Sequence, residues 1–347
     1  MKRLITLTVV VLLGLGGHCQ EAESNLFKKE EPLTLVLTMN VNEVIRDVKK
    51  REYHQARLSV LDGSDTVESH DLKVKVRGNN RAKRPICKFP PLRLNFKKKH
   101  TKGTLFENQD KLKLVTHCNT KKSNEEYVMR EYYAYKVYQL VSPVSFRVRL
   151  CHVKYLDEEG DFDPGPHVGF LIEDIDQLAK RQGMVIFKDS IQNQEACTRD
   201  QLDKLTFFEY LIGNLDWSIP HRHNIKLVRK DEHSAPVAVP YDFDHAGIVA
   251  AAYAKPPPDI DIRSVKERVF RGLCRPIGGY DPTVQFYQKI KPNLYEIYRK
   301  AEFLSEKSKE MTLGYLDDFY KILDDPKAVE KYIVKACRAN HKHLYQY

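Results

Sequence analysis

The most informative stretch of this sequence is Gly213-Asn214-Leu215-Asp216-Trp217-Ser218-Ile219-Pro220-His221-Arg222-His223-Asn224. A second acidic segment follows it, Tyr241-Asp242-Phe243-Asp244-His245-Ala246-Gly247. Carboxylate and amide oxygens bind divalent metal ions, and a carboxylate can also orient a hydroxyl group toward a phosphate. Acidic residues on either side of an asparagine therefore indicate a site for metal and phosphate.

The chemistry of phosphoryl transfer gives each of these polar residues a candidate role. One carboxylate orients the acceptor hydroxyl, while an asparagine and a second carboxylate bind the magnesium that bridges the phosphates. On this interpretation Asp216 is the catalytic base, Asn224 is a metal ligand and Asp242 is the main metal carboxylate. Asp244 is a second candidate for the last role. The alternative is that these residues only cap turns and form a surface loop.

Helix and strand patterns surround the two acidic segments. Residues 199–212 have the apolar spacing of an amphipathic helix that leads directly into Gly213. Two short strands, 224–228 and 237–240, predict a hairpin that brings Asn224 and Asp242 to one space. Three prolines then break the chain, and helical patterns follow at 260–273, 282–303, 305–323 and 326–340.

The first half of the sequence is rich in strand patterns. Apolar residues alternate between turn clusters at 33–39, 56–61, 72–77, 92–96 and 111–115, and again at 146–155 and 167–172. One helix is predicted over 127–141, with Ser123 in a capping box and Pro143 beyond its end. An acidic hairpin turn is predicted at 157–165. We therefore predict a strand-rich lobe at 33–172, a helical lobe at 173–347 and a ligand cleft between them.

The sequence begins with the pattern of a secretory signal peptide. Met1-Lys2-Arg3 is basic, residues 4–15 are apolar, and residues 16–22 are small and polar. The apolar run is too short to cross a bilayer, so we predict a signal peptide over 1–22 and a flexible lead-in over 23–32. The predicted location is periplasmic, extracellular or at the cell surface. A lipid anchor at Cys19 is an alternative that would attach the protein to a membrane.

The remaining cysteines and the charge distribution limit the class of protein. Six cysteines follow the predicted signal peptide without a Cys-x-x-Cys motif, which disfavours a structural zinc site and leaves any disulfide pairing open. The formal net charge is +10, and many of the basic residues lie between 73 and 102. This region is either a solvated face or a site for nucleotide phosphates or an acidic partner. No base-reading motif is present, so we predict no nucleic-acid partner.

A series of short motifs runs through roughly residues 70–250. They are Arg77-Gly78-Asn79-Asn80, Pro91-Leu92-Arg93-Leu94-Asn95-Phe96, Met129-Arg130-Glu131-Tyr132-Tyr133-Ala134-Tyr135, Val168-Gly169-Phe170-Leu171-Ile172-Glu173, Asn214-Leu215-Asp216-Trp217 and Tyr241-Asp242-Phe243-Asp244. Their order resembles that of the CotH family, which comprises spore-coat-type atypical protein kinases. The segment 213–227 also resembles the catalytic loop of phosphoinositide kinases, and Asp242-Phe243 resembles their Asp-Phe-Gly motif.

The resemblance implies an α+β, two-lobed protein-kinase-like fold, with one main helix in a β-rich N-lobe and a helical C-lobe. It also implies transfer of the γ-phosphate of ATP, with Mg²⁺ or Mn²⁺, to Ser or Thr of a secreted or surface protein. Lys88 or Arg93 would bind the phosphates and pair with Glu131 on the helix. Glu173 would lie at the hinge that contacts adenine.

The sequence also departs from the kinase pattern. Asp216 and Asn224 are eight residues apart instead of about five, so the loop between them must bulge, with Pro220 a candidate position. There is no Gly-x-Gly-x-x-Gly phosphate loop, and residues after about 255 match no part of the family.

Three other functions remain open at this point. The first is a catalytically inactive scaffold of the same fold, which the scarcity of ATP outside the cytoplasm favours. The second is transfer of AMP instead of phosphate. The third is a metallohydrolase in which the histidines of the two acidic segments, together with Asp242 and Asp244, bind zinc or two metal ions. The histidines are His221, His223 and His245.

Overall fold

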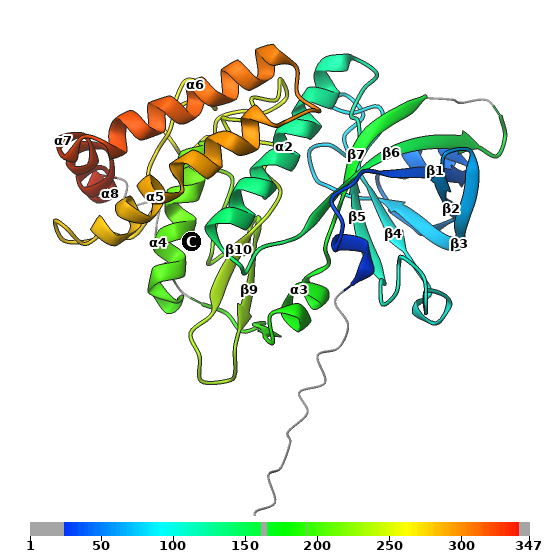
Figure 1. The fold of residues 1–347 in the computed structure, drawn as a ribbon, viewed down its shortest axis with the longest axis horizontal. Coiled ribbons are helices and arrows are strands. Elements are labelled where there is room, and N and C mark those ends of the chain that lie inside the picture. The colour runs from blue at the N-terminus through cyan, green and yellow to red at the C-terminus, as the bar shows by residue number, and fades with distance from the viewer. Residues whose placement is uncertain (1–23, 161–164, 192, 340–347) are drawn as a thin grey trace, which may run out of the picture.

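The computed structural model describes residues 24–160, 165–191 and 193–339 (Figure 1). The predicted signal peptide and the candidate lipid anchor at Cys19 lie outside these residues. The predicted lead-in is described from Ser24 and lies against the strands: Leu26 and Phe27 are buried in a 3₁₀ turn. Arg149 Nη1 donates a hydrogen bond to the main-chain oxygen of Leu26 at 2.8 Å. This part of the lead-in therefore has fixed contacts with the strands.

Seven strands of the first half close into a barrel, in the order β1-β2-β3-β4-β5-β7-β6. Their bounds are β1 Leu33–Met39, β2 His54–Asp62, β3 Asp65–Val76, β4 Leu92–Asn95, β5 Lys111–Val115, β6 Val148–Asp157 and β7 Pro166–Ile172. Six of the pairings are antiparallel, and the parallel pairing of β1 with β6 closes the ring. Buried residues alternate along β1 and β4, so one side of the sheet forms the barrel core.

The closed barrel contradicts the predicted fold class, the α+β, two-lobed kinase-like fold with one main helix in a β-rich N-lobe. The alternation of apolar residues located six of the strands within two residues at each end, but the prediction of β3 over 72–77 missed the first seven residues of that strand. Closure, however, depends on the register that places Leu33 opposite Cys151, across more than a hundred residues of chain. Alternation shows which face of a strand is buried, but it does not identify a distant partner strand. A short helix, α1 (Val41–Arg46), was also missed; the Asn40 side chain caps it by accepting from the Glu43 N–H at 2.9 Å.

Helix α2 (Lys122–Val141) connects the barrel to the helical half of the molecule (Figure 1). It contacts β6 and β7 on one side and α4 and α5 on the other. Because both sides are covered, most of its central residues are buried, including the charged Glu131. The predicted capping box at Ser123 is wrong, since the helix begins before it and its N-cap residue, Lys121, makes no side-chain capping bond.

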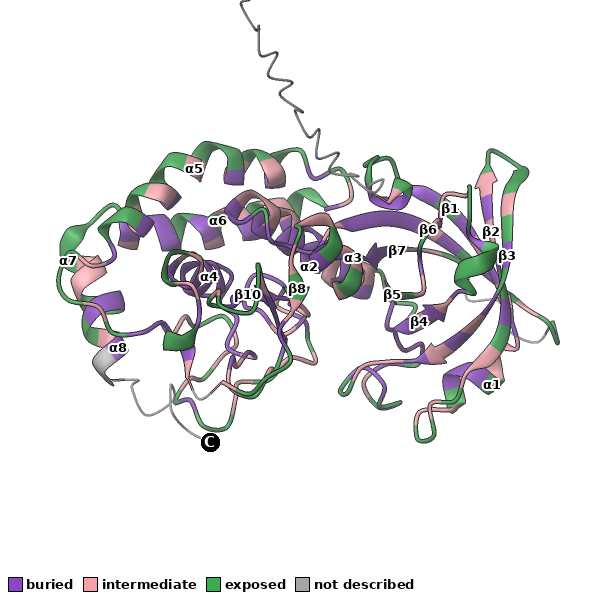
Figure 2. Ribbon diagram, turned by 90° about the horizontal axis from the view of Figure 1, so that it is seen from below, coloured by how far each residue is buried: buried purple, intermediate pink, exposed green. Residues whose placement is uncertain are grey.

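The second half contains the remaining helices and a small sheet. The helices are α3 Ile175–Arg181, α4 Arg199–Ile212, α5 Asp281–Arg299, α6 Glu306–Leu323, α7 Pro326–Val329 and α8 Lys335–Ala339, with a π-helical turn at Glu330–Val334. Strands β8 Val185–Ile186, β9 Ile225–Arg229 and β10 Val237–Pro240 form a sheet in the order β10-β9-β8. Figure 2 shows that α2, α4 and β10 are largely buried, whereas the outer face of α5 is exposed.

The helix predicted over 260–273 is wrong, because these residues form turns and irregular chain. Two arginines of this segment bond to main-chain oxygens elsewhere. Arg271 Nη1 donates to the oxygens of Leu215 at 2.6 Å and Trp217 at 3.0 Å, and Arg268 Nη2 donates to Leu211 at 3.2 Å. Such tertiary contacts override a helical apolar pattern. They also attach this segment to the loop that carries Asp216.

Two disulfides, Cys87–Cys118 and Cys274–Cys337, resolve the pairing that the sequence left open. Cys151 and Cys197 are buried free thiols. Burial raises the pKa of Cys197 to about 12, so this thiol has little thiolate character. Within the described part of the chain, no helix combines the length and the apolar character that crossing a membrane requires.

Candidate functional site

The loop that carries Asp216 starts at Gly213, the residue that ends α4. Gly213 has φ 65°, and an added Cβ would lie 2.0 Å from the Tyr315 hydroxyl oxygen, so only glycine fits without a rearrangement. The Gly213 oxygen accepts a hydrogen bond from the Gly247 N–H at 3.0 Å. The main chain therefore joins the two acidic segments directly at this glycine.

A tight turn accounts for the eight-residue spacing between Asp216 and Asn224. The main-chain N–H of Ser218 donates to the oxygen of His223 at 2.9 Å, and the N–H of His223 donates back at 3.0 Å. Residues 219–222, which include Pro220, form the turn that this pair of bonds closes. Arg222 holds the tip of the turn, because its Nη1 donates to the oxygen of Phe187 at 2.7 Å. The extra residues form this turn, and Asn224 therefore lies next to Asp216.

Asp216 is held by residues at the far end of this turn. His223 Nε2 lies 2.7 Å from Asp216 Oδ1, and Asn224 Nδ2 donates to Asp216 Oδ2 at 3.1 Å and to its main-chain oxygen at 2.7 Å. Burial opposes the ionisation of Asp216, but the hydrogen bond and charge of His223 outweigh it and lower the pKa of this carboxyl. The same bond raises the pKa of His223 against its partial burial. Asp216 is therefore ionised at neutral pH. Both bonds from Asn224 to Asp216 use its amide nitrogen, and neither uses its amide oxygen.

Asp242 and Asp244 follow β10 and face the same region. The main-chain N–H of Asp242 donates to the Tyr135 hydroxyl on α2 at 2.9 Å, and Tyr253 Oη donates to Asp244 Oδ2 at 3.1 Å. Asn224 and Asp242 both have positive φ, 51° and 67°. Non-glycine residues in this conformation are uncommon, although Asn and Asp tolerate it best. The structure holds two neighbouring polar residues in strained conformations, as is typical of functional sites.

A cavity of about 290 Å³ brings these predicted residues together. Asp216, Asn224, Asp242 and Asp244 all line it. The turn at residues 77–81, which carries Arg77 and Arg81 at its ends, lines it from the barrel. Carboxylates and an amide therefore face two guanidinium groups, an arrangement that suits a metal ion together with phosphate groups.

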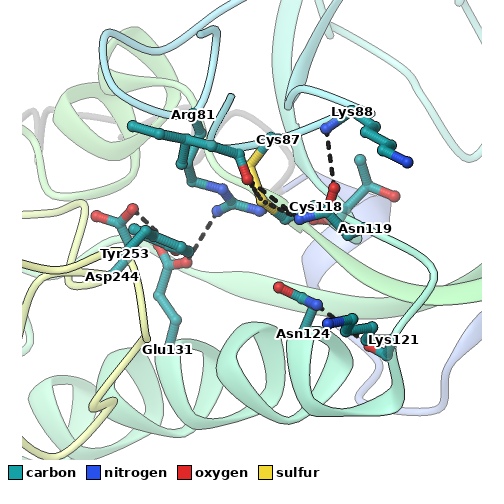
Figure 3. The surroundings of a disulfide bond; sticks show 12 residues. Arg81, Cys87, Lys88, Cys118, Asn119, Lys121, Asn124, Glu131, Asp244 and Tyr253 are labelled. Atoms are coloured by element: carbon teal, nitrogen blue, oxygen red, sulfur yellow. Dashed lines mark hydrogen bonds and ion pairs between the residues drawn. A yellow bond between two sulfur atoms is a disulfide. The ribbon is translucent and has the colours of Figure 1, made fainter. Parts of the chain in front are cut away.

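The cation that contacts Glu131 is Arg81 (Figure 3). Arg81 Nη1 lies 3.5 Å from Glu131 Oε2, and Arg81 Nη2 donates to the main-chain oxygen of Thr116 at 2.6 Å. Both partners of this ion pair are buried. Lys88, one of the two cations predicted to pair with Glu131, is exposed, and its side chain points away from the pair in Figure 3. The predicted contact between Glu131 and Lys88 or Arg93 is replaced by one with Arg81.

Arg93 belongs to a second group of cations, beside the cavity. It lies opposite Lys113 in the pairing of β4 with β5, and its charge, like that of Arg77, lowers the pKa of Lys113. Burial is the largest cause of that shift, which brings the pKa of Lys113 to about 7. Lys113 Nζ lies 4.1 Å from the ring centroid of Tyr241, the residue before Asp242. Lys113 therefore links the basic surface of the barrel to the second acidic segment.

Glu173 is occupied by structural partners. Arg181 binds it in a bidentate manner, with Nε 2.9 Å from Oε1 and Nη2 2.8 Å from Oε2, and the Arg147 N–H donates to Oε2 at 3.1 Å. Its side chain is almost entirely buried. Glu173 therefore stabilises the junction of β7 and α3. Its predicted contact with adenine stays a prediction, and main-chain atoms would have to make that contact.

The charges around the cavity favour the binding of a cation. Burial, together with repulsion from Asp242, raises the pKa of Asp244 to about 6. Burial and the charge of Asp244 also raise the pKa of Glu131 well above its usual range, and Glu131 Oε1 has no hydrogen-bond partner among the described residues. These carboxylates exceed what Arg81 and Arg77 neutralise, and a divalent cation would relieve the repulsion.

The donor set of the cavity fits magnesium or manganese better than zinc. In the described ranges, no group of three or more His, Cys, Asp and Glu side chains is arranged to hold a metal ion alone. Magnesium keeps several waters and is bound by one or two carboxylates plus substrate phosphates. Asn224, Asp242 and Asp244 can supply the protein ligands, and a nucleotide would supply the phosphates. His223 Nε2 is engaged with Asp216 and the Asn80 side chain lies 3.4 Å from His245 Nε2, which disfavours the histidine-rich hydrolase.

Neither Arg81 nor Lys113 was predicted as a partner of the carboxylates of the site. Arg81 directly follows the turn at 77–80, which is one of the family-like motifs, and it belongs to the basic region predicted to be a solvated face or a site for phosphates or an acidic partner. Lys113 lies between buried leucines on β5. Lysines that alternate with apolar residues in a strand are ordinarily expected to be exposed. A lysine in a short strand just before a buried helix that carries Glu131 was the available signal.

Comparison with known proteins adds no further assignment. The sequence matches no protein-family model, and no curated protein matches it. The resemblance to the CotH family therefore stays a prediction that depends on its motifs.

The disulfide Cys87–Cys118 provides a test of how Arg81 is positioned. It closes the loop that begins at Arg81 and joins it to the chain just beyond Thr116, the residue that accepts the Arg81 bond (Figure 3). We expect Cys87→Ser/Cys118→Ser to lower the free energy of unfolding by about 3 kcal/mol, and the folded variant to lose any phosphate transfer that depends on the position of Arg81. Urea unfolding and activity of the folded fraction measure the two effects.

The second disulfide is the matched control. Cys274–Cys337 closes a loop of 63 residues in the helical half, and its cysteines do not line the cavity. Cys274→Ser/Cys337→Ser should lose a similar amount of stability while the folded protein keeps its activity. Equal activity losses in the two variants would contradict a specific role for the first disulfide.

Proposed function

We propose that this protein is a phosphotransferase that moves the γ-phosphate of ATP to a Ser or Thr hydroxyl of another protein. The observation that carries the proposal is the cavity where Asp216, Asn224, Asp242 and Asp244 face the arginines of the turn at 77–81. The proposal takes an activity from the CotH-like motifs, whereas their implied fold is excluded by the closed barrel.

In this proposal Asp216 is the catalytic base. It is ionised because of His223, so it can accept the proton of the hydroxyl as that oxygen forms its bond to the γ-phosphorus. The bond from the γ-phosphorus to the β–γ bridging oxygen breaks, and the negative charge leaves with ADP. His223 and Asn224 hold the two carboxylate oxygens in place, and a remaining lone pair would accept the hydroxyl proton.

The other residues bind and neutralise the phosphates. Asn224, Asp242 and Asp244 would hold Mg²⁺ or Mn²⁺, which when bound neutralises the phosphate oxygens. Arg77 and Arg81 supply fixed positive charge on the opposite wall, and Glu131 orients Arg81. Arg93 and Lys113 extend this positive surface. Lys88 is exposed and does not line the cavity, so it has no role in this proposal.

Export is part of the proposal. A basic and apolar amino-terminus typical of a signal peptide and two disulfides both support a protein that folds outside the cytoplasm. The proposed acceptor is accordingly a secreted or surface protein.

Radiolabelled ATP tests the proposed reaction directly. The protein is incubated with Mg²⁺ or Mn²⁺ and with ATP labelled at either the γ- or the α-phosphate, and label on protein is then measured. We expect label from the γ-position only. Label from the α-position would instead support AMP transfer, and no label on this protein or on co-secreted proteins would support the scaffold.

The pKa of Asp244 predicts how stability depends on pH. Because its pKa rises from 3.8 to about 6 on folding, the folded protein holds this proton more tightly than the unfolded chain. The stabilising contribution is therefore present below about pH 4 and is lost as pH rises through 6. We expect metal-free wild type to lose about 2 kcal/mol relative to Asp244→Asn over this interval. Parallel curves of unfolding free energy against pH for the two proteins would contradict this.

A further inference from the structure

A second cavity adjoins the first at Asp216. Its volume is about 600 Å³, and the two cavities share four lining residues, Asn80, Asp216, His223 and His245. The proposed catalytic base therefore lies where both cavities can reach it. A site of this volume is typical of bound ligands of several residues or of drug size, and it is too small for a folded domain.

The walls of the second cavity differ from those of the first. The segment Pro256-Pro257-Pro258 forms one wall together with Ile262 and Val265. Prolines have no N–H, so this wall is an apolar strip that cannot donate hydrogen bonds. An extended peptide can lie along such a strip through its apolar atoms, as in the recognition of rigid proline segments.

Two buried donors without acceptors belong to residues that line this cavity. Trp217 is 3% exposed, and neither its Nε1 nor Arg271 Nε has a hydrogen-bond partner among the described residues. Arg271 Nη1 donates to the oxygens of Leu215 and Trp217, and its Cζ lies 5.4 Å from the centroid of the Trp217 ring. A buried donor without an acceptor is costly, so a ligand that brings oxygen atoms to this wall gains free energy.

One cation on the wall of this cavity has no ion-pair partner among the described residues. The carboxylate of Asp216 pairs with His223, and the charges of Asp259, Glu209 and Asp216 act on Arg271. Lys255 lines the cavity as well, and the described residues give it no ion-pair partner within 4.0 Å. Its ammonium group is thus the charge that an acidic side chain of a ligand can neutralise.

We propose that the second cavity binds the acceptor as an extended peptide whose Ser or Thr reaches Asp216, while a neighbouring Asp or Glu pairs with Lys255. This proposal rests on the proposed function for the role of Asp216. The occupant is a protein segment because the cavity combines an apolar strip, unpartnered donors and a cation over the span of several residues.

Intrinsic fluorescence provides a readout that is independent of catalysis. Trp217 is the single tryptophan of the sequence and lines this cavity. The whole protein is titrated, without nucleotide, with a serine peptide flanked by glutamates and with the same peptide carrying glutamines. We expect the acidic peptide to change the Trp217 emission and to bind at least about tenfold more tightly than the glutamine peptide. Equal binding of the two peptides, or no binding, would overturn the proposal.

Variants of two lysines locate the binding site. Lys255→Gln should lower the affinity for the acidic peptide about tenfold and remove the preference for it over the glutamine peptide. Lys230→Gln, at the exposed turn between β9 and β10, should bind both peptides as wild type does. Calorimetry repeats both titrations without relying on fluorescence. Unchanged discrimination in Lys255→Gln would contradict the assignment.

The same peptides separate this inference from the proposed function. If both peptides accept label from γ-labelled ATP at equal rates, the phosphotransferase stands and the acidic acceptor site is wrong. If the acidic peptide binds through Lys255 but no label is transferred with Mg²⁺ or Mn²⁺, the peptide site stands and the phosphotransferase is wrong.

Discussion

Asp242→Asn is expected to lower the rate of γ-phosphate transfer by about a thousandfold or more. Asp242 lies in the cavity between Arg77 and Asp244, and its main chain is fixed to Tyr135 on α2. Its loss removes the carboxylate to which we assign the main metal contact. The measurement is the single-turnover rate with γ-labelled ATP at saturating Mg²⁺.

Asparagine is the informative replacement at this position. Asp242 has φ 67°, a conformation that asparagine tolerates, so the variant removes a charge without adding the strain that alanine would bring. The unfolding free energy should accordingly stay within about 1 kcal/mol of wild type. Asp318→Asn, which removes an exposed carboxylate on α6, is the matched control and should transfer phosphate at the wild-type rate. A rate for Asp242→Asn within threefold of that control would show that Asp242 is not a metal ligand.

Arg81→Met is expected to destabilise the protein by about 3 kcal/mol at neutral pH and to abolish activity. The change leaves Glu131 in the interior without its ion-pair partner and frees the oxygen of Thr116. Glu131 can escape part of this penalty by taking a proton, because its pKa is already raised by burial. The loss of stability should therefore be smaller at pH 5 than at pH 8. Urea unfolding at the two pH values measures it.

A double variant separates stability from function at this pair. Arg81→Met/Glu131→Leu removes both buried charges, and it should recover most of the stability without recovering activity. Arg57→Met is a control, since Arg57 makes an exposed ion pair with Asp71 and its loss should leave the unfolding free energy close to that of wild type. A double variant as unstable as Arg81→Met alone would contradict a dominant role for the uncompensated Glu131 charge.

Local patterns predicted the secondary structure around the candidate site. Helix α4 was predicted with its observed bounds, and the hairpin of β9 and β10 returns the chain so that Asn224 and Asp242 line one cavity. These elements are close together in the sequence, so their geometry follows from periodicity and turn residues. The same logic located the strands of the barrel.

Contacts between distant segments could not be predicted in this way. The barrel closes through β1 and β6, and Arg81 reaches Glu131 across fifty residues from a turn whose position over the cavity depends on that closure. The expected cation was sought on a strand near Lys88 and Arg93, because the kinase resemblance places it there. The segment 260–273 is a second example. Arg271 bonds to the loop that carries Asp216, and this tertiary contact overrides the helix that the apolar pattern predicts.

Nucleotide-dependent binding of Mn²⁺ is the most direct test that these side chains form one metal and phosphate site. Electron paramagnetic resonance measures protein-bound Mn²⁺ with and without a non-hydrolysable ATP analogue. The expected result is a bound Mn²⁺ that requires the analogue and that Asp242→Asn weakens at least about tenfold, whereas Asp318→Asn does not. Binding that ignores the analogue, or that survives unchanged in Asp242→Asn, would contradict the proposed site.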